Sequence, residues 1–400
     1  MACFFFLVMA FVATAGLAYG QETIKFGVFG PMTGPAAETG LAIKHASELA
    51  MEEINAKGGL LGKKIECIWG DDESKPEVGV SLYEKFATRD KVNLVIGGLH
   101  SSVGIAMMEP ASKYDVLFFS GAPMSSIIAD KIEKNPQKYW MVFKGDTSSD
   151  VYGPGTANFI KAVENQGFNP KSRNYVSIIE DTDFGRSVVG AIEKSMGESN
   201  WKNLDREVVK IDQADYTAQM SKFKGMKPDV VFSVQTSVAA AASLCKTFRE
   251  SRIPALLFVI YTAAKPEYIK LTGAASNGVC WIVGIAIIPS LSKDFIAAYK
   301  KKFNEEPSEN AAMQYDYMMI VASAIKSAGT TDGRKLAEAL LKTRYQGACG
   351  IHAYDPKNHE VKAGEDYIPS LVYQIQNQKD VIIFPFKYGQ GKFQLPSYVK

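Results

Sequence analysis

The sequence lacks any concentrated run of basic residues, and its charges nearly balance. Forty-five Lys and Arg stand against forty-three Asp and Glu in 400 residues, which leaves a formal net charge of +2. Nucleic-acid binding needs a basic patch or stripe, so we expect no nucleic-acid partner. Histidine is scarce as well, and no two of the four histidines stand four positions apart, as a metalloprotease helix would require.

Sequence motifs of several enzyme classes are also missing. There is no G-x-x-x-x-G-K-[ST] phosphate loop and no G-x-S-x-G nucleophile elbow, and FGVFGPMTG lacks the G-x-G-x-x-G spacing of a dinucleotide site. No Cys-x-x-Cys pair supports a zinc or redox site. The acidic cluster Glu180, Asp181 and Asp183 could hold a cation or act in acid-base chemistry, but we favour a solvated loop whose Asp caps the following helix. We therefore expect no enzymatic activity, no cofactor and no metal.

Cysteine is sparse, and four remain if an N-terminal leader is removed. Cys67, Cys245 and Cys280 fall in segments with apolar periodicity, which favours buried free thiols for them. An exported chain could instead pair its cysteines in disulfides. The fourth is Cys349.

Long apolar runs are absent after the N-terminus, where Phe4 to Ala13 is too short to span a bilayer as a helix. Ala18 and Gly20 stand three and one positions before Gln21, so the pattern predicts a signal peptide over residues 1–20. No Lys or Arg precedes the run, which leaves an uncleaved membrane anchor as the second interpretation. No later segment has eighteen uninterrupted apolar residues, so we expect a water-soluble mature chain.

Short apolar runs alternate with amphipathic segments along the rest of the chain. This alternation predicts an α/β fold made of βαβ units, with parallel sheets covered by helices on both faces. The alternation begins again after YWMVFKGD, and 400 residues exceed what one core usually supports, so we expect two similar lobes. The expected strands are TIKFGVFG, KKIECIWG, VNLVIGG and VLFFSGA in the first series, NYVSIIE, REVVKID, DVVFSVQ and ALLFVIY in the second, and SLVYQIQ and VIIFPF near the end.

Two of these strands, VNLVIGG and VLFFSGA, both end in loops rich in Gly and Ser. Ligands of open parallel sheets bind beyond the carboxyl ends of the strands, and helix N-termini there favour an anion. The loops therefore indicate a site for an anionic group. A Ser at a helix start is more often only an N-cap, so that interpretation stays beside the first. The residues concerned are Ser101, Ser102, Gly121, Ser125 and Ser126.

Several segments of the sequence are similar to those of a known family. TIKFGVFGPMTGPAAETG followed by EEINAKGGLLGKKIECIWGDDESKP resembles the N-terminus of the periplasmic binding proteins for branched-chain amino acids. VIGGLHSS, EDTDFGRS, QADYTAQMSKFKGMKPDVVF and QYDYMMIVASAIKSAG continue the resemblance in the same order. It implies the type I periplasmic binding protein fold, with two α/β lobes joined by a three-segment hinge near Lys144, Gly284 and Ser370. Lobe 1 would comprise residues 21–143 and 284–369, and lobe 2 residues 144–283 and 370–400.

The resemblance also implies a function. Such a protein is a periplasmic monomer that captures an amino acid, or a related small carboxylate or amide, in the interlobe cleft. It delivers this ligand unaltered to the membrane permease of an ABC importer. The alternative is the ligand-sensing module of a receptor or regulator with the same fold. A sensor is expected to carry an output domain or a permanent transmembrane helix, and we expect neither here.

By the same resemblance, a Ser hydroxyl and a neighbouring loop hold the ligand's carboxylate. These are Ser101 and the backbone around Ala122. Met124 falls where the family has a Thr, so Ser125 either takes over that contact or the contact is lost. His100 is expected either to wall the pocket or to lie as a partly buried core residue. The predicted ligand-binding residues are His100, Ser101, Ala122, Met124, Ser125, Phe184, Thr236 and Tyr261.

A second departure concerns the ligand's amine. Family members that bind α-amino acids have a Glu at the end of the strand ALLFVIY, and this sequence has Tyr261 there. A buried ammonium without a carboxylate partner would be costly. We therefore expect either that another acid, such as Asp181 or Asp183, takes over, or that the ligand has no amine. In the second case an aromatic or aliphatic carboxylate, or an uncharged amide, would suit Tyr261 and Phe184.

Overall fold

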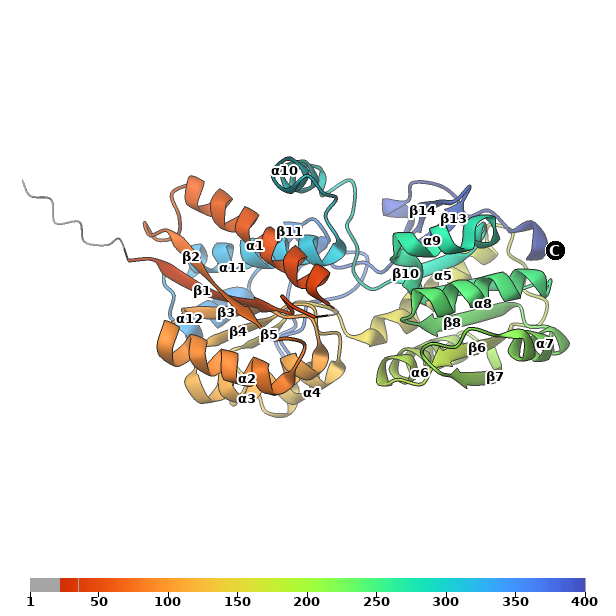
Figure 1. The fold of residues 1–400 in the computed structure, drawn as a ribbon, viewed down its shortest axis with the longest axis horizontal. Helices are drawn as coiled ribbons and strands as arrows, with labels where there is room; N and C mark the ends of the chain where they lie inside the picture. Colours follow the sequence, from red (N-terminus) through yellow and green to blue (C-terminus); the bar gives the residue numbers. More distant parts are fainter. Residues whose placement is uncertain (1–21, 35, 400) are drawn as a thin grey trace, which may run out of the picture.

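A computed structural model describes residues 22–34 and 36–399 of the protein, arranged as two lobes side by side (Figure 1). The signal-peptide prediction for residues 1–20 lies outside the described residues. Within them, no helix combines the length and apolarity needed to cross a membrane. Each lobe contains one large sheet, with strand order β2-β1-β3-β4-β5 in the first and β14-β13-β10-β9-β8-β6-β7 in the second. The predicted two-lobed α/β fold is confirmed.

The first sheet is parallel throughout. Every residue of β3 and β4 is buried, because helices cover both faces of the sheet. Its strands are β1 (Ile24–Gly30), β2 (Ile65–Asp71), β3 (Leu94–Gly97), β4 (Leu117–Ser120) and β5 (Val142–Lys144). The helices of this lobe are α1 (Ala37–Ala56), α2 (Pro76–Lys85), α3 (Ser101–Tyr114), α4 (Ser126–Lys134), α10 (Lys293–Phe303), α11 (Glu309–Ala328) and α12 (Gly333–Leu341), with the π-helix η1 (Phe86–Asp90) and the hairpin β11 (Tyr345–Gly347) and β12 (Gly350–His352).

The second sheet is mixed, so the expectation of a parallel sheet is wrong at one edge. β13 runs antiparallel to both β10 and β14. The reason is local: Asn377 and Gln378 both have positive φ, 52° and 59°, which makes a two-residue hairpin turn that forces antiparallel pairing. The strands are β6 (Asn174–Glu180), β7 (Lys202–Val209), β8 (Val230–Gln235), β9 (Leu256–Tyr261), β10 (Cys280–Val283), β13 (Leu371–Gln376) and β14 (Lys379–Phe384). The helices are α5 (Tyr152–Glu164), α6 (Asp183–Glu198), α7 (Thr217–Met226), α8 (Val238–Glu250) and α9 (Pro266–Thr272), with the short 3-10 turns η2 (Ser149–Val151), η3 (Thr262–Ala264), η4 (Gly273–Ser276), η5 (Phe386–Tyr388) and η6 (Ser397–Val399).

Each sheet separates two hydrophobic clusters. In the first lobe, α1, α10, α11 and α12 cover one face, while α2, α3 and α4 cover the other. In the second lobe, α7, α8 and α9 pack on one face, while α5 and α6 pack on the opposite one. Cys67, Cys245, Cys280 and Cys349 lie inside these layers as buried free thiols, as the apolar periodicity around three of them predicted.

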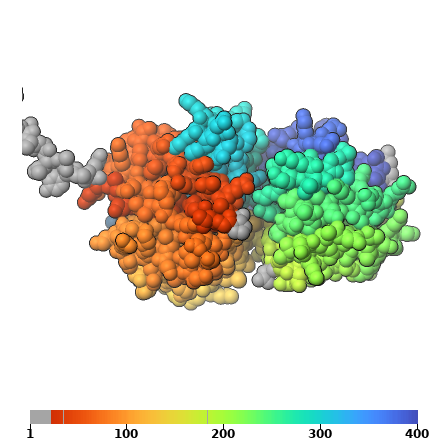
Figure 2. All heavy atoms as spheres, viewed as in Figure 1, coloured from red at the N-terminus to blue at the C-terminus, as the bar shows by residue number. Residues whose placement is uncertain are grey.

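The chain passes between the two sheets three times: between β5 and β6, after β10, and before β13. Figure 2 shows the two lobes in contact along a groove, with the red and orange N-terminal residues on one side and green residues on the other. The carboxyl ends of the central parallel strands are directed toward this groove. The fold therefore brings strand-end loops of both lobes to one place.

Candidate functional site

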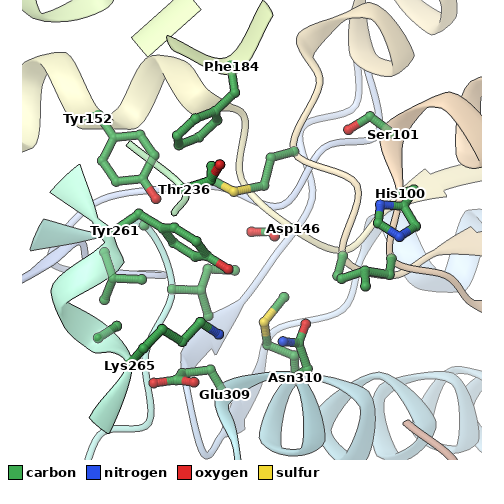
Figure 3. A pocket seen from close by; sticks show the side chains of 18 residues that line it. His100, Ser101, Asp146, Tyr152, Phe184, Thr236, Tyr261, Lys265, Glu309 and Asn310 are labelled. Carbon is green, nitrogen blue, oxygen red and sulfur yellow. The ribbon is translucent and has the colours of Figure 1, made fainter. Parts of the chain in front are cut away.

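A cavity of about 430 Å³ lies where these strand-end loops meet (Figure 3). Seven of the eight residues predicted to bind ligand line it, and Ser125 does not. That the seven bind a ligand stays a prediction. The lining residues are Leu99, His100, Ser101, Ala122, Met124, Asp146, Tyr152, Phe184, Thr236, Tyr261, Ala264, Lys265, Val283, Gly284, Ile285, Glu309, Asn310 and Met313.

Ser101 and Ser125 have different places at the edge of the first lobe. Ser101 is the first residue of α3, and its Oγ accepts a hydrogen bond from the Ser125 amide at 3.2 Å. The Ser125 Oγ accepts from the Ile127 amide at 3.3 Å and so caps α4. The N-cap interpretation therefore applies to Ser125, whose hydroxyl is occupied away from the cavity.

The loop after β4 provides less than the sequence suggested. Ala122 lines the cavity, but its N–H already donates to the Gly98 carbonyl at 3.2 Å. At this edge of the cavity, the first-turn N–H groups of α3 have no intrahelical partner. The same helix end carries partial positive charge. This edge of the cavity can therefore bind an anion through α3 and Ser101.

Met124 joins the two lobes. It extends from the loop after β4 and packs against the hydrophobic cluster on the α5 and α6 face of the second sheet. Its carbonyl accepts a hydrogen bond from the Ser149 amide at 3.2 Å. An apolar thioether therefore lies at the position where the resemblance predicted a Thr hydroxyl.

His100 is half-buried beside Ser101, which agrees both with a residue of the pocket wall and with a partly buried core residue. It lines the cavity, and its Nε2 is buried without a hydrogen-bond partner among the described residues. Behind it, Asp72 is fully buried. Burial raises the pKa of the Asp72 carboxyl, and the backbone N–H of Ser74 and the His100 ring counter this in part.

Thr236 reaches the cavity from the loop after β8, where a buried acid fixes it. The Oε2 of Glu180 accepts from the Thr236 amide at 2.7 Å and from its hydroxyl at 2.8 Å. The Oε1 accepts from the Thr182 hydroxyl at 2.9 Å. The Glu180 carboxylate is thus engaged by three donors and positions Thr236 without facing the ligand site itself.

Tyr261 ends β9 in a strained conformation, with φ 69° and ψ −56°, which an L-residue rarely adopts. This conformation directs the ring toward Phe184, with centroids 6.1 Å apart in a T-shaped arrangement. Phe184 makes a second T-shaped contact with Tyr152, at 6.3 Å. Lys265 Nζ lies 5.4 Å from the centroid of the Tyr261 ring.

Two acids that the sequence did not suggest face the cavity, and the side chain of Asp183, which it did suggest, lies outside what the structure describes. Asp181 is exposed and paired with Arg186, outside the lining. Asp146 and Glu309 line the cavity instead. Asp146 follows the end of β5 by two residues, so the strand-end rule that selected Ser101 could also have selected it.

Asp146 is 5% exposed, and burial raises its pKa to about 7, against the opposing effect of Lys144. Its Oδ1 accepts from the Thr147 amide at 2.7 Å. The fully buried Lys144 Nζ donates to the Asp146 carbonyl at 2.7 Å and to Glu360 Oε1 at 3.0 Å. A buried carboxylate thus faces the cavity at the segment that leads into the second lobe.

Among residues 22–34 and 36–399, no group of three or more His, Cys, Asp or Glu is arranged to hold a metal ion.

Comparisons with known proteins agree with this architecture. A sequence model of the family described as periplasmic binding protein matches residues 23–376. The Leu/Ile/Val-binding protein homolog 1 of Brucella suis biovar 1 is 27% identical over 376 residues, which cover 91% of this chain and 92% of the relative. A solved structure assigned to a branched-chain amino acid ABC transporter of Silicibacter pomeroyi has a TM-score of 0.90 at 21% identity, covering 94% of this chain and 100% of that one. The solute-binding protein of an ABC transporter from R. palustris, solved in complex with benzoate, has a TM-score of 0.70 at 18% identity, with 90% and 95% covered.

Proposed function

This chain belongs to the periplasmic binding protein family, and from that premise we propose that it captures a small carboxylate-bearing solute between its lobes and delivers it unaltered to an ABC importer. Amino acids, related carboxylates and amides are the ligand class. The place of action is the periplasm, and the partner is the membrane permease of the importer. Names of relatives that bind branched-chain amino acids or benzoate support this class.

The observation that carries the proposal is the position of the cavity. It lies between two α/β lobes, at the carboxyl ends of their parallel strands, where ligands of such sheets bind. The N-terminal turn of α3 and the Ser101 hydroxyl supply donors for a carboxylate on one side. Aromatic rings from the second lobe supply the opposite wall.

We assign the working motion to the three interlobe segments near Lys144, Gly284 and Ser370. Rotation of lobe 1 (residues 21–143 and 284–369) against lobe 2 (residues 144–283 and 370–400) would open and close the cavity around the solute. The contact between Met124 and the second-lobe cluster supports closure, since it joins the lobes beside the cavity.

A thermal-shift screen of the mature chain against amino acids, aromatic acids and small amides tests the function. A ligand that binds only the folded state stabilises it by about 2.7 kcal/mol at a concentration a hundredfold above its dissociation constant. We expect at least one carboxylate to raise the melting temperature. Hydrolysis or other turnover of the ligand would contradict a role in binding alone.

Ser101→Ala is expected to weaken the best ligand of that screen by about 1 to 3 kcal/mol, because a desolvated carboxylate oxygen would lose its hydroxyl donor. Calorimetric titration measures the change. Ser125→Ala is the matched control, because its hydroxyl caps α4 away from the cavity and its loss should lower stability more than affinity. Equal affinity of the Ser101 variant and the unaltered protein would remove Ser101 from the site.

A further inference from the structure

Three aromatic rings form one wall of the cavity. Tyr152, Phe184 and Tyr261 are joined by two T-shaped contacts, with interplanar angles of 90° and 67°. Successive rings are therefore turned steeply relative to one another. Figure 3 shows the three rings grouped on one side of the cavity, opposite Ser101 and His100. Tyr152 is fully buried, so Phe184 and Tyr261 form the accessible part of this wall, and electron-rich ring faces suit a cation.

The structure already contains a cation on one of these rings. Lys265 Nζ lies over Tyr261 at 5.4 Å from the centroid, within the range of a cation–π contact. Burial acts to lower the pKa of Lys265, but Tyr261, Glu309 and Glu38 together outweigh it, and the net shift is upward. The charge of Lys265 is thus met by neighbouring acids and the Tyr261 ring.

The Asp146 carboxylate lines the same cavity, and burial together with the charge of Asp146 raises the pKa of the Tyr152 hydroxyl. Its Oδ1 is engaged by the Thr147 amide, while no hydrogen bond to its Oδ2 occurs within the described part of the chain. With Glu309, two acids line the cavity against one lysine. Because Glu309 acts on Lys265, Asp146 is the acid of the lining that remains for a cationic group on the ligand.

The sheet sets the distance between the anion-binding edge and Asp146. Ser101 follows β3 and Asp146 follows β5, with β4 between them. Neighbouring strands lie about 4.8 Å apart, so the ends of β3 and β5 that carry these two residues are separated by roughly 10 Å. A ligand that reaches both needs its carboxylate and its cationic group several atoms apart.

Resting on the proposed function, we propose that the solute is a zwitterion with a carboxylate and a methylated, quaternary ammonium group. The carboxylate lies at Ser101 and the first turn of α3. The ammonium methyl groups lie against Tyr152, Phe184 and Tyr261, with Asp146 as the counter-charge.

The hydrogen-bonding state of the surrounding acids favours the methylated group over a primary ammonium. A primary ammonium has three N–H donors, each of which needs an acceptor when buried. Glu180 is engaged by three donors of its own, so beside the rings the Asp146 carboxylate alone would have to accept from all three N–H groups. A quaternary ammonium needs no acceptor and buries its methyl groups on the rings.

Three probes that differ in one group test the proposal: γ-trimethylammoniobutyrate, γ-aminobutyrate, and the neutral isostere in which carbon replaces the quaternary nitrogen. Calorimetric titration at about pH 8 is expected to give the quaternary compound at least tenfold tighter binding than either of the others. Equal binding of the neutral isostere would show that the wall selects shape alone and would overturn the proposal. Tightest binding of the primary amine would overturn it as well.

Substitutions of single residues test which side chains cause the preference for the quaternary compound. Asp146→Asn is expected to reduce the preference for the quaternary compound over its isostere about tenfold, while Asp181→Asn, an exposed acid outside the cavity, leaves it unchanged. Tyr261→Phe should retain the preference and Tyr261→Leu should reduce it, since the ring and not the hydroxyl provides the surface. An unchanged preference in both Asp146→Asn and Tyr261→Leu overturns the assignment. If all three probes fail while other carboxylates bind, this inference alone falls; if no carboxylate or amide binds, the proposed function falls with it.

Discussion

Lys144→Met is expected to lower the free energy of unfolding by about 3 to 5 kcal/mol, the usual cost of removing one partner of a buried ion pair. The Lys144 side chain is fully buried, and Glu360, its partner at 3.0 Å, is 17% exposed. Glu360 also accepts from the Ser148 hydroxyl at 2.5 Å. Without the lysine, a largely buried carboxylate would keep its charge but lose its cation. Denaturant titration monitored by circular dichroism measures the loss.

Lys300→Met is the matched control, because Lys300 and its partner Glu306 are 50% and 73% exposed. Exposed pairs contribute about 0 to 1 kcal/mol, so this variant should unfold almost like the unaltered protein. Similar losses in the two variants would show that loss of the lysine stem, and not burial of the pair, determines the effect.

The Lys144–Glu360 pair also lies at the first interlobe segment. The backbone of Lys144 pairs with the two residues on either side of Glu360. The Lys144 N–H donates to the His359 carbonyl at 3.0 Å, and the Lys144 carbonyl accepts from the Val361 N–H at 3.0 Å. Its ammonium also holds the Asp146 carbonyl at 2.7 Å. The first interlobe segment is thus anchored to the first lobe immediately before it enters the cavity.

Periodicity was sufficient to predict the two sheets because their central strands are apolar on both faces. β3, β4 and β8 are buried along their whole length, so a short apolar run between amphipathic helices could only be a covered strand. The two strands of the β13 and β14 hairpin were also predicted, as SLVYQIQ and VIIFPF. Its antiparallel direction was missed because the alternation of strands and helices was interpreted as parallel sheets throughout, although a two-residue turn excludes parallel pairing.

The lining of the cavity was predictable where a sequence motif marks the end of a strand. It was not predictable where tertiary packing determines which residues come together. Ser101 and Thr236 stand in loops that match the family in sequence order. Asp146 follows a three-residue strand within YWMVFKGD, and only the structure shows that this strand completes the first sheet beside β4. Lys265 and Glu309 come from segments far apart in sequence, so no local pattern could place them in one cavity.

Asp146→Asn is expected to stabilise the ligand-free protein above neutral pH by up to about 4 kcal/mol, the energy of a pKa raised from 3.8 to about 7 at about 1.4 kcal/mol per unit. Below about pH 4 the carboxyl is protonated in both folded and unfolded chains, so it contributes no pH dependence. Between about pH 4 and 7 the unfolded chain releases this proton and the folded chain keeps it, so stability falls as pH rises. Asparagine avoids this loss and can still accept from the Thr147 amide.

Unfolding titrations of both proteins at about pH 4, 6 and 8 measure the difference. The advantage of the variant should be near zero at the lowest pH and largest at the highest. A constant difference across the series would mean that Asp146 does not titrate between these values. The ionisable groups that act on Asp146 are Lys144, which favours its charge, and Glu360, which opposes it.

The protonation of Asp146 also links the stability of the protein to its choice of ligand. A quaternary ammonium beside Asp146 would favour the ionised carboxylate, so binding below about pH 7 must release a proton. The affinity of the unaltered protein for γ-trimethylammoniobutyrate is therefore expected to fall up to tenfold for each pH unit below that point, whereas Asp146→Asn should bind it weakly with no such slope. Calorimetry in buffers of different ionisation enthalpy counts the released proton directly. The residue that destabilises the empty protein at neutral pH would then be the one that supplies the charge for its ligand, a trade-off expected of a binding site.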